Sequence, residues 1–365
     1  MFKRGLLSPQ IMEEPWWRRP STLPLMLVVM AFLIIAVGGS IRINDAGESC
    51  PEWPTCFGTW HFVVSEEQQG EYWAENPDQI DSRGPDHRYT TFQIFVEWFH
   101  RMLVGVIAIP ILANVFLAQR GTFPRAIKPL TYAAAVLLVV QAAAGYITVE
   151  FDNADWTVAL HLSLASIFTS ILMYQYMRMR ALEGVKWDWL DKATSSFLSQ
   201  HTKRMHSMAG ALGLLLVLGA WVSSSAGGQY NQSCSVGFPN GWPKCQGSFL
   251  PSLEGPGIFI QMIHRGGAVV VGLVLVMATA AMRNHPSLGK GDADLVKMAE
   301  VTTGVWILNV LVGGSYIVFA KIGDFPEWLS LLHLVVGVSA FLCSMAMVFA
   351  VRLAGVPNPA GVESE

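Results

Sequence analysis

Long apolar runs separated by short polar segments dominate the sequence. Eight runs are long enough to cross a bilayer, because about 20 mostly apolar residues span its hydrocarbon core as a helix. They lie near 22–43, 91–117, 127–149, 155–178, 203–225, 257–281, 295–320 and 327–352. This pattern predicts an all-α integral membrane protein with eight transmembrane helices.

The composition supports the same prediction. The 365 residues are 52% hydrophobic and only 14% charged, with a mean hydropathy of +0.40, whereas soluble domains are about a quarter charged. Lysine and arginine concentrate before the first helix and in alternate loops, which places these segments and the N-terminus in the cytoplasm. We therefore expect a multi-pass protein of the cell (plasma) membrane. The net charge of −3 gives no sign of nucleic-acid binding.

The order of features repeats along the chain. "FVEWFHRMLVGV" in the second apolar run matches "FIQMIHRGGAVV" in the sixth, and both are preceded by a loop that holds two cysteines. Because both copies begin on the inner side, the repeat is parallel, about an axis along the membrane normal. The predicted parts are a cytoplasmic tail (1–21), an N-terminal four-helix half (22–178), a cytoplasmic linker (179–202), a C-terminal four-helix half (203–352) and a C-terminal tail (353–365).

Four histidines fall inside predicted helices: His100, His161, His264 and His333. Each lies in an even-numbered helix at a similar depth, roughly 6–15 Å below the outer surface, and each half holds one pair. One such histidine suggests a hydrogen bond between helices, but a duplicated pair favours metal ligation. Two imidazoles on facing helices suit a haem iron bound from both sides. Zinc is disfavoured, since no cysteine or carboxylate cluster accompanies them.

Charged neighbours distinguish the two halves. Arg101 and Arg265 directly follow two of these histidines and are candidate partners of haem propionates, because a buried arginine needs a partner. Bonds to loop carbonyls or to an acid of an outer loop are the alternative. Glu97 lies three residues before His100, on the same helix face, whereas Gln261 holds this position in the second half. We predict that Glu97 is catalytic; a simple salt bridge to Arg101 is the alternative.

Cysteines occur in pairs in two predicted outer loops. Cys50 and Cys56 lie in the first loop and Cys234 and Cys245 in the third, while Cys343 is alone in the last helix. Paired cysteines on the oxidising side of a membrane predict two disulfides, Cys50–Cys56 and Cys234–Cys245. A redox role stays open, because these loops cover the helix ends that carry the histidines.

Together these features resemble the haem A synthase family. The resemblance covers about residues 25 to 350: eight helices in tandem halves, a Glu-x-x-His-Arg motif at Glu97, a His-Arg pair at His264, and single histidines in the fourth and eighth helices. It implies conversion of haem O to haem A, by oxidation of one porphyrin methyl group to a formyl group through successive hydroxylations, for assembly of a terminal oxidase. The long acidic loop at 65–91 is not matched to the family, and we expect a lid or a partner surface there.

The resemblance also implies roles for the two halves. Substrate haem O would bind in the N-terminal half with His100 and His161, beside Glu97, and a resident haem b would bind to His264 and His333. The implied partners are haem O synthase (protohaem farnesyltransferase), the terminal oxidase, an electron acceptor and membrane lipid. A quinol-linked dihaem cytochrome b is the alternative function, and it accounts for the four histidines but not for the Glu97/Gln261 difference. A haem transporter is a third possibility, weakened by the absence of broken helices.

Overall fold

The computed structural model describes residues 15–183, 193–224 and 234–354. Within these ranges the chain is helical and has no β-strand beyond isolated bridges. The α-helices are α1 (Thr22–Ile43), α2 (Glu66–Glu75), α3 (Thr91–Gln119), α4 (Lys128–Glu150), α5 (Asp155–Leu182), α6 (Ser195–Ser224), α8 (Pro256–Arg283), α9 (Lys290–Val318) and α10 (Glu327–Ala354). All of them except α2 are long and apolar enough to span a membrane, which confirms the eight predicted spans.

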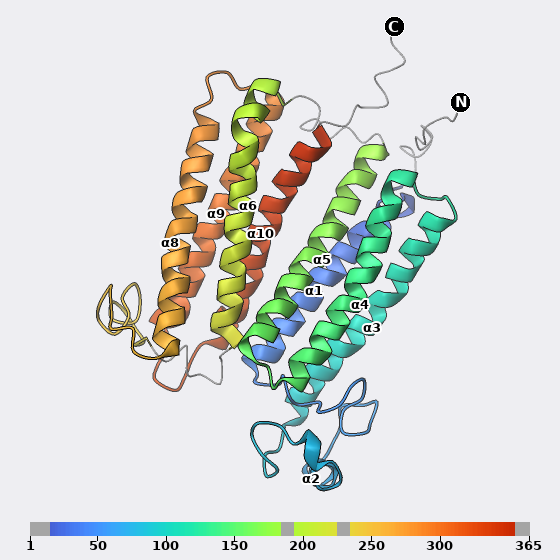
Figure 1. Cartoon of the computed structure of the whole chain (residues 1–365), viewed down its shortest axis with the longest axis vertical. Helices are drawn as coiled ribbons and strands as arrows, with labels where there is room; N and C mark the ends of the chain where they lie inside the picture. Colours follow the sequence, from blue (N-terminus) through green and yellow to red (C-terminus); the bar gives the residue numbers. More distant parts are fainter. Residues whose placement is uncertain (1–14, 184–192, 225–233, 355–365) are drawn as a thin grey trace.

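The long helices form two groups of four (Figure 1). In the first, α1, α3, α4 and α5 pack in a closed ring, each against its two neighbours, and α6, α8, α9 and α10 repeat this arrangement in the second. The groups meet where α5 packs against α6 and α10, and where α1 packs against α10. The tandem repeat in the sequence therefore corresponds to two similar bundles that lie side by side.

One apolar core is continuous across the junction of the bundles. Met208 of α6, Leu275 of α8 and Val338 of α10 are fully buried, and Ile35 of α1 and Met177 of α5 join the same cluster. Since this core includes side chains from both groups, the bundles are packed against each other through apolar contacts and not only tethered by the linker.

Several helices extend beyond the apolar runs in the sequence. Helix α5 continues to Leu182 and α6 begins at Ser195, so both reach into the predicted linker, whose residues 184–192 lie outside the described ranges. Likewise, α9 begins at Lys290, several residues before its apolar run. These extensions include charged or polar residues, such as Arg180 and Lys290, in helical backbone, and an apolar pattern alone does not reveal them.

The acidic first loop folds into a small layer of its own below the first bundle (Figure 1). Its helix α2 begins with a capping box at Ser65 and buries Trp73 against the Cys50–Cys56 disulfide. The Gln69 side chain is fully buried, donates to the Tyr89 carbonyl at 3.0 Å and accepts from the Tyr89 amide at 2.8 Å. This segment is a folded cap that lies on the disulfide loop and the start of α3.

Candidate functional site

The four intramembrane histidines lie in equivalent places. Each is within the first three turns of its helix: His100 in α3, His161 in α5, His264 in α8 and His333 in α10. These helix ends are the ones next to the two disulfide-bearing loops, at the lower end of both bundles in Figure 1. The fold therefore brings one histidine pair to the same end of each bundle, as the repeat predicts.

A glycine of the preceding long helix lies against every one of these imidazoles. A Cβ added at Gly38 would lie 3.2 Å from Cε1 of His100, and one at Gly145 would lie 3.0 Å from Cε1 of His161. In the second bundle the corresponding distances are 3.1 Å from Gly219 to His264 and 2.7 Å from Gly313 to His333. A side chain at any of these glycines would occupy space that the imidazole needs, so the glycines fix how closely each ring approaches its neighbouring helix.

The pair in the second bundle has a geometry that fits a single iron between two imidazoles. The ring centroids of His264 and His333 are 6.3 Å apart. Two imidazoles that bind one metal from opposite sides, at the usual metal–nitrogen distance of about 2 Å, have centroids about 6 Å apart. Nδ1 of His333 lies 2.9 Å from the Asn309 carbonyl and donates to it, which leaves Nε2 as the nitrogen with a lone pair. These residues fit a bis-histidine haem.

The pair in the first bundle has different polar surroundings. His100 and His161 are close enough to interact electrostatically. The side-chain nitrogen of Gln141 lies 3.2 Å from Nδ1 and 3.3 Å from Nε2 of His161, and it donates to the His161 carbonyl at 3.0 Å. Gln141 precedes Gly145 by four residues, as Asn309 precedes Gly313, so the two amides hold equivalent positions. His161 of the first bundle contacts the side-chain amide of Gln141, whereas His333 of the second bundle donates to the backbone carbonyl of Asn309.

Glu97 and Arg101 form a buried network with the first disulfide loop. Oε1 of Glu97 accepts from Nη2 of Arg101 at 2.6 Å, and both side chains are at most 8% exposed. Oε2 accepts from the Ser49 hydroxyl at 2.9 Å and from the Cys50 amide at 3.0 Å. The salt bridge considered as the alternative for Glu97 is thus present. It holds the carboxylate one helical turn before His100, in contact with Ser49 and Cys50 of the first loop.

The two arginines that follow a histidine differ in how their donors are used. Arg101 donates from Nη1 to the carbonyls of Glu52 and Thr55, and from Nη2 to Glu97 and to the Cys50 carbonyl at 2.7 Å. Arg265 donates from Nη1 to the carbonyls of Gly241 and Lys244, both at 2.8 Å, but its buried Nη2 has no hydrogen-bond partner. Only Arg265 therefore has a terminal nitrogen left to bind an anion such as a propionate.

Both expected disulfides are present, and each is part of a loop that an arginine holds. Cys50 is bonded to Cys56, and Cys234 to Cys245. In the first loop, burial and a hydrogen bond from the Tyr89 hydroxyl to Asp81 raise the pKa of this tyrosine. The loop with Cys50–Cys56 leads into α3, which carries His100, and the loop with Cys234–Cys245 leads into α8, which carries His264.

Sequence reasoning missed the four glycines, Gln141 and Asn309. A signal for them existed, because "VVQAAAGY" and "ILNVLVGGSY" match between the halves and both place an amide four residues before a glycine. The sequence could not show that each of these glycines faces an imidazole of the next long helix.

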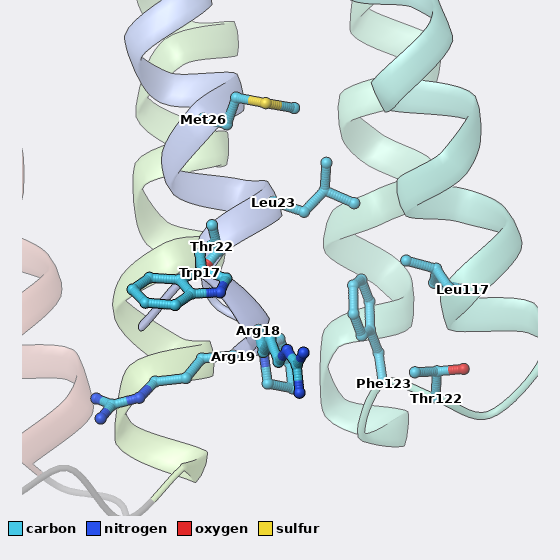
Figure 2. Close-up of a pocket in the computed structure, with 10 residues that line it drawn as sticks. Trp17, Arg18, Arg19, Thr22, Leu23, Met26, Leu117, Thr122 and Phe123 are labelled. Atoms are coloured by element: carbon cyan, nitrogen blue, oxygen red, sulfur yellow. The ribbon is translucent and has the colours of Figure 1, made fainter. Parts of the chain in front are cut away.

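The described residues also line a cavity at the opposite end of the first bundle (Figure 2). It has a volume of about 340 Å³ and lies between two segments: Trp17 with Leu23 and Met26 at the start of α1, and Leu117 near the end of α3 with Phe123 of the following loop. None of the four histidines lines this cavity, so it is separate from the candidate haem sites. In the described ranges, no group of three or more histidine, cysteine, aspartate or glutamate side chains is arranged to hold a metal ion directly.

Comparison with known proteins gives one consistent result. The sequence model of a family described as "Cytochrome oxidase assembly protein", COX15-CtaA, matches residues 21–345. The chain is 25% identical to "Heme A synthase" of Shewanella oneidensis over 80% of its own length and 85% of that protein. It is 26% identical to "Heme A synthase" of Novosphingobium aromaticivorans (85% and 89% covered) and 28% identical to that of Cereibacter sphaeroides (87% of each).

Proposed function

The chain belongs to the COX15-CtaA family of cytochrome oxidase assembly proteins, and we propose that it is a haem A synthase. The reaction converts haem O to haem A by oxidising one porphyrin methyl group to a formyl group through successive hydroxylations. The observation that carries this proposal is the similarity to proteins named "Heme A synthase" over most of the chain. The duplicated histidine pairs, which suit two haems, support it from the structure.

We assign the substrate site to the first bundle, with His100 and His161 as iron ligands. A haem supplies the redox chemistry of such an oxidation, and the protein supplies ligands, orientation and local charge. Glu97 is the acid in this bundle whose counterpart in the second is neutral. Methyl oxidation releases protons, and Glu97, one helical turn from His100, is placed to accept one once its bond to Arg101 or Ser49 opens.

We assign a resident haem b to the second bundle, with His264 and His333 as its ligands. The 6.3 Å separation of the two rings and the bond from His333 to the Asn309 carbonyl support this role. The unpaired Nη2 of Arg265 supports a contact with a propionate. Arg101 has all its terminal nitrogens engaged by the loop and Glu97, so we assign it to holding the loop in place.

The distribution of basic residues indicates where the protein is located and how it is oriented in the membrane. We place the protein in the plasma membrane with the disulfide loops on the outer face, as the distribution of lysine and arginine predicts. Its partners would be the enzyme that supplies haem O, the terminal oxidase that receives haem A, and an acceptor for the electrons removed from the methyl group.

A reconstitution experiment tests the function. The purified protein is incubated with haem O and an electron acceptor, and the extracted pigments are identified by mass. We expect haem A from the native chain, none from His100→Ala, and normal yield from His206→Ala, which changes an exposed histidine of α6 in the second bundle, far from both histidine pairs along the helix. Bound haem without any hydroxymethyl or formyl product would refute the proposal and favour a dihaem electron-transfer protein.

A further inference from the structure

Arg42 joins the two bundles at the end where the histidines lie. Its Nε donates to the backbone carbonyl of Ser223 at 3.2 Å, a bond between residues 181 positions apart. Arg42 is near the end of α1 and Ser223 near the end of α6. Figure 1 shows these two helix ends close together at the junction of the bundles. The bond therefore ties one bundle to the other near the helix ends that carry the histidines.

The two bonded residues hold equivalent positions in the repeat. Arg42 follows Gly38 by four residues, and Ser223 follows Gly219 by four. A Cβ added at either glycine would lie at nearly the same distance from its imidazole, 3.2 Å for His100 and 3.1 Å for His264. The register of the repeat is thus fixed by structure. It places a cation in the first bundle where the second has a neutral serine.

Arg42 is near both iron-ligand positions. Residues four apart lie on the same face of a helix, about 6 Å along its axis. Arg42 therefore lies one turn beyond the contact between Gly38 and His100. Its bonded partner Ser223 lies one turn beyond the contact between Gly219 and His264. The guanidinium is on the order of 10 Å from each imidazole.

The charge of Arg42 is fixed, and most of its charged neighbours are acidic. An arginine keeps its positive charge under all ordinary conditions in proteins. The carboxylates of Asp45, Glu48 and Asp155 are close enough to interact with it electrostatically, and so is the guanidinium of Arg83, which forms an ion pair with Asp45 at 2.9 Å. Glu48 is itself held by bonds from Ser82 at 3.1 Å and Asn153 at 3.1 Å. Removal of Arg42 would thus take one positive charge from the junction and leave these acids less balanced.

We propose that Arg42 is an electrostatic residue shared by both haem sites, whose positive charge at the junction raises the reduction potential of the haem held by His264 and His333. A haem iron that takes up one electron gains one negative charge, and a nearby cation stabilises that reduced form. The resident haem then becomes a better acceptor for electrons that leave the substrate site. This inference rests on the proposed function for the identity of the two haems.

The test is a redox titration of the haem bound to the purified protein, followed by absorption. A unit charge about 10 Å away, in a medium of effective dielectric constant about 20, changes an equilibrium roughly tenfold or more. For Arg42→Gln we therefore expect the equilibrium between oxidised and reduced haem to shift roughly tenfold toward the oxidised form. This corresponds to a reduction potential that is lower by about 59 mV for a one-electron couple. Arg42→Lys keeps the charge and should stay near the native potential. Lys321→Gln, which removes an exposed cation from another loop, should leave it unchanged.

Three results would overturn the inference. A native potential in Arg42→Gln, with haem bound, would show that Arg42 only ties the bundles together. An equal shift in Lys321→Gln would show a general effect of surface charge. A shift in Arg42→Lys as large as in Arg42→Gln would show that helix position, not charge, sets the potential. A native protein that binds no haem would instead refute the ligand assignment of the proposed function, so the two failures are distinguishable.

Discussion

Gly313→Ala is the substitution for which the structure makes the sharpest quantitative prediction. The added Cβ would lie 2.7 Å from Cε1 and 2.8 Å from Nδ1 of His333, whereas carbon atoms pack best at about 3.5–4.0 Å. The imidazole must therefore retreat by about 1 Å, or α9 must move away from α10 by a similar distance. Either movement stretches the 2.9 Å bond from His333 to the Asn309 carbonyl beyond hydrogen-bond range.

The expected cost follows from these two effects. Overpacking in a tightly packed interior costs about 1–3 kcal/mol, and loss of the hydrogen bond adds about 0.5–1.5 kcal/mol. The displaced ring also loses its alignment with His264. We therefore expect Gly313→Ala to lower the Tm, to reduce the haem content per chain and to weaken the low-spin bis-histidine absorption spectrum.

Gly304→Ala is the matched control on the same helix. Nothing lies within 4 Å of a Cβ added at Gly304, and the position is exposed. An alanine inside a helix is favoured over glycine by roughly 0.5–1 kcal/mol, so this variant should be as stable as the native chain or more so. If Gly313→Ala keeps the native haem content and spectrum, and has the Tm of Gly304→Ala, then the glycine contact does not position His333.

Four further predictions follow from other contacts. Glu97→Gln should lower haem A formation by about 10²-fold or more, the scale for loss of a positioned proton acceptor, while the spectrum of the resident haem persists. A near-normal yield of haem A in the extracted pigment would show that Glu97 acts only through its structural salt bridge. Gln261→Glu places an acid four residues before Arg265, as Glu97 lies four residues before Arg101. The new carboxylate should bind the free Nη2 of Arg265 and lower the content of resident haem. An unchanged haem content would exclude Arg265 as a propionate partner. Mass mapping without reductant should find Cys50 linked to Cys56 and Cys234 to Cys245, and Cys50→Ser should lower the Tm because its loop carries the Glu97 network; free thiols would contradict this. Because the pKa of Tyr89 is raised in the folded loop, its stabilising effect is present below the unfolded pKa of about 10 and is lost as pH rises above it. In a series of Tm against pH, Tyr89→Phe should therefore show a smaller alkaline loss than the native chain, and an identical loss would exclude Tyr89 as its cause.

The eight helices could be predicted because each must present enough apolar surface to span a bilayer. The apolar pattern located all of them, but it ended α5 before its true end at Leu182 and began α6 after its true start at Ser195. The missing turns hold charged and polar residues in continued helical backbone. An apolar pattern is set by the solvent around the helix, whereas the ends are set by hydrogen bonding and capping.

The first loop shows a second limit of sequence reasoning. Its acidic composition suggested only a lid or a partner surface. In the structure, Trp73 and Tyr89 form a small core with the Cys50–Cys56 disulfide, and Gln69 bonds to both backbone groups of Tyr89. Each of these contacts joins residues many positions apart, and no periodicity marks them. Folding of such a loop depends on a few specific contacts that only the three-dimensional arrangement reveals.

The candidate site was predictable to the extent that it is duplicated. Position in the repeat singled out the four histidines, and the exchange of Glu97 for Gln261 marked the first half as different. The sequence could not decide between a catalytic carboxylate and a salt bridge, because both need an arginine nearby. The structure shows the salt bridge. It also shows that the terminal nitrogens of Arg101 are all engaged whereas Nη2 of Arg265 has no partner, a difference that the identical His-Arg motifs do not indicate.

A difference in chemistry between the two bundles must arise from a few polar positions, since the framework around the histidines is nearly the same. A Cβ added at Gly38 or Gly219 would lie 3.2 Å or 3.1 Å from the facing imidazole, so backbone placement does not distinguish these two sites. The histidines that we assign as second ligands differ in their contacts. His333 donates to a backbone carbonyl, an acceptor that a moving side chain cannot remove, whereas His161 contacts the side chain of Gln141, which can rotate away. A ligand held by the backbone suits a haem that stays, and a ligand that meets a movable amide suits a haem that enters, reacts and leaves.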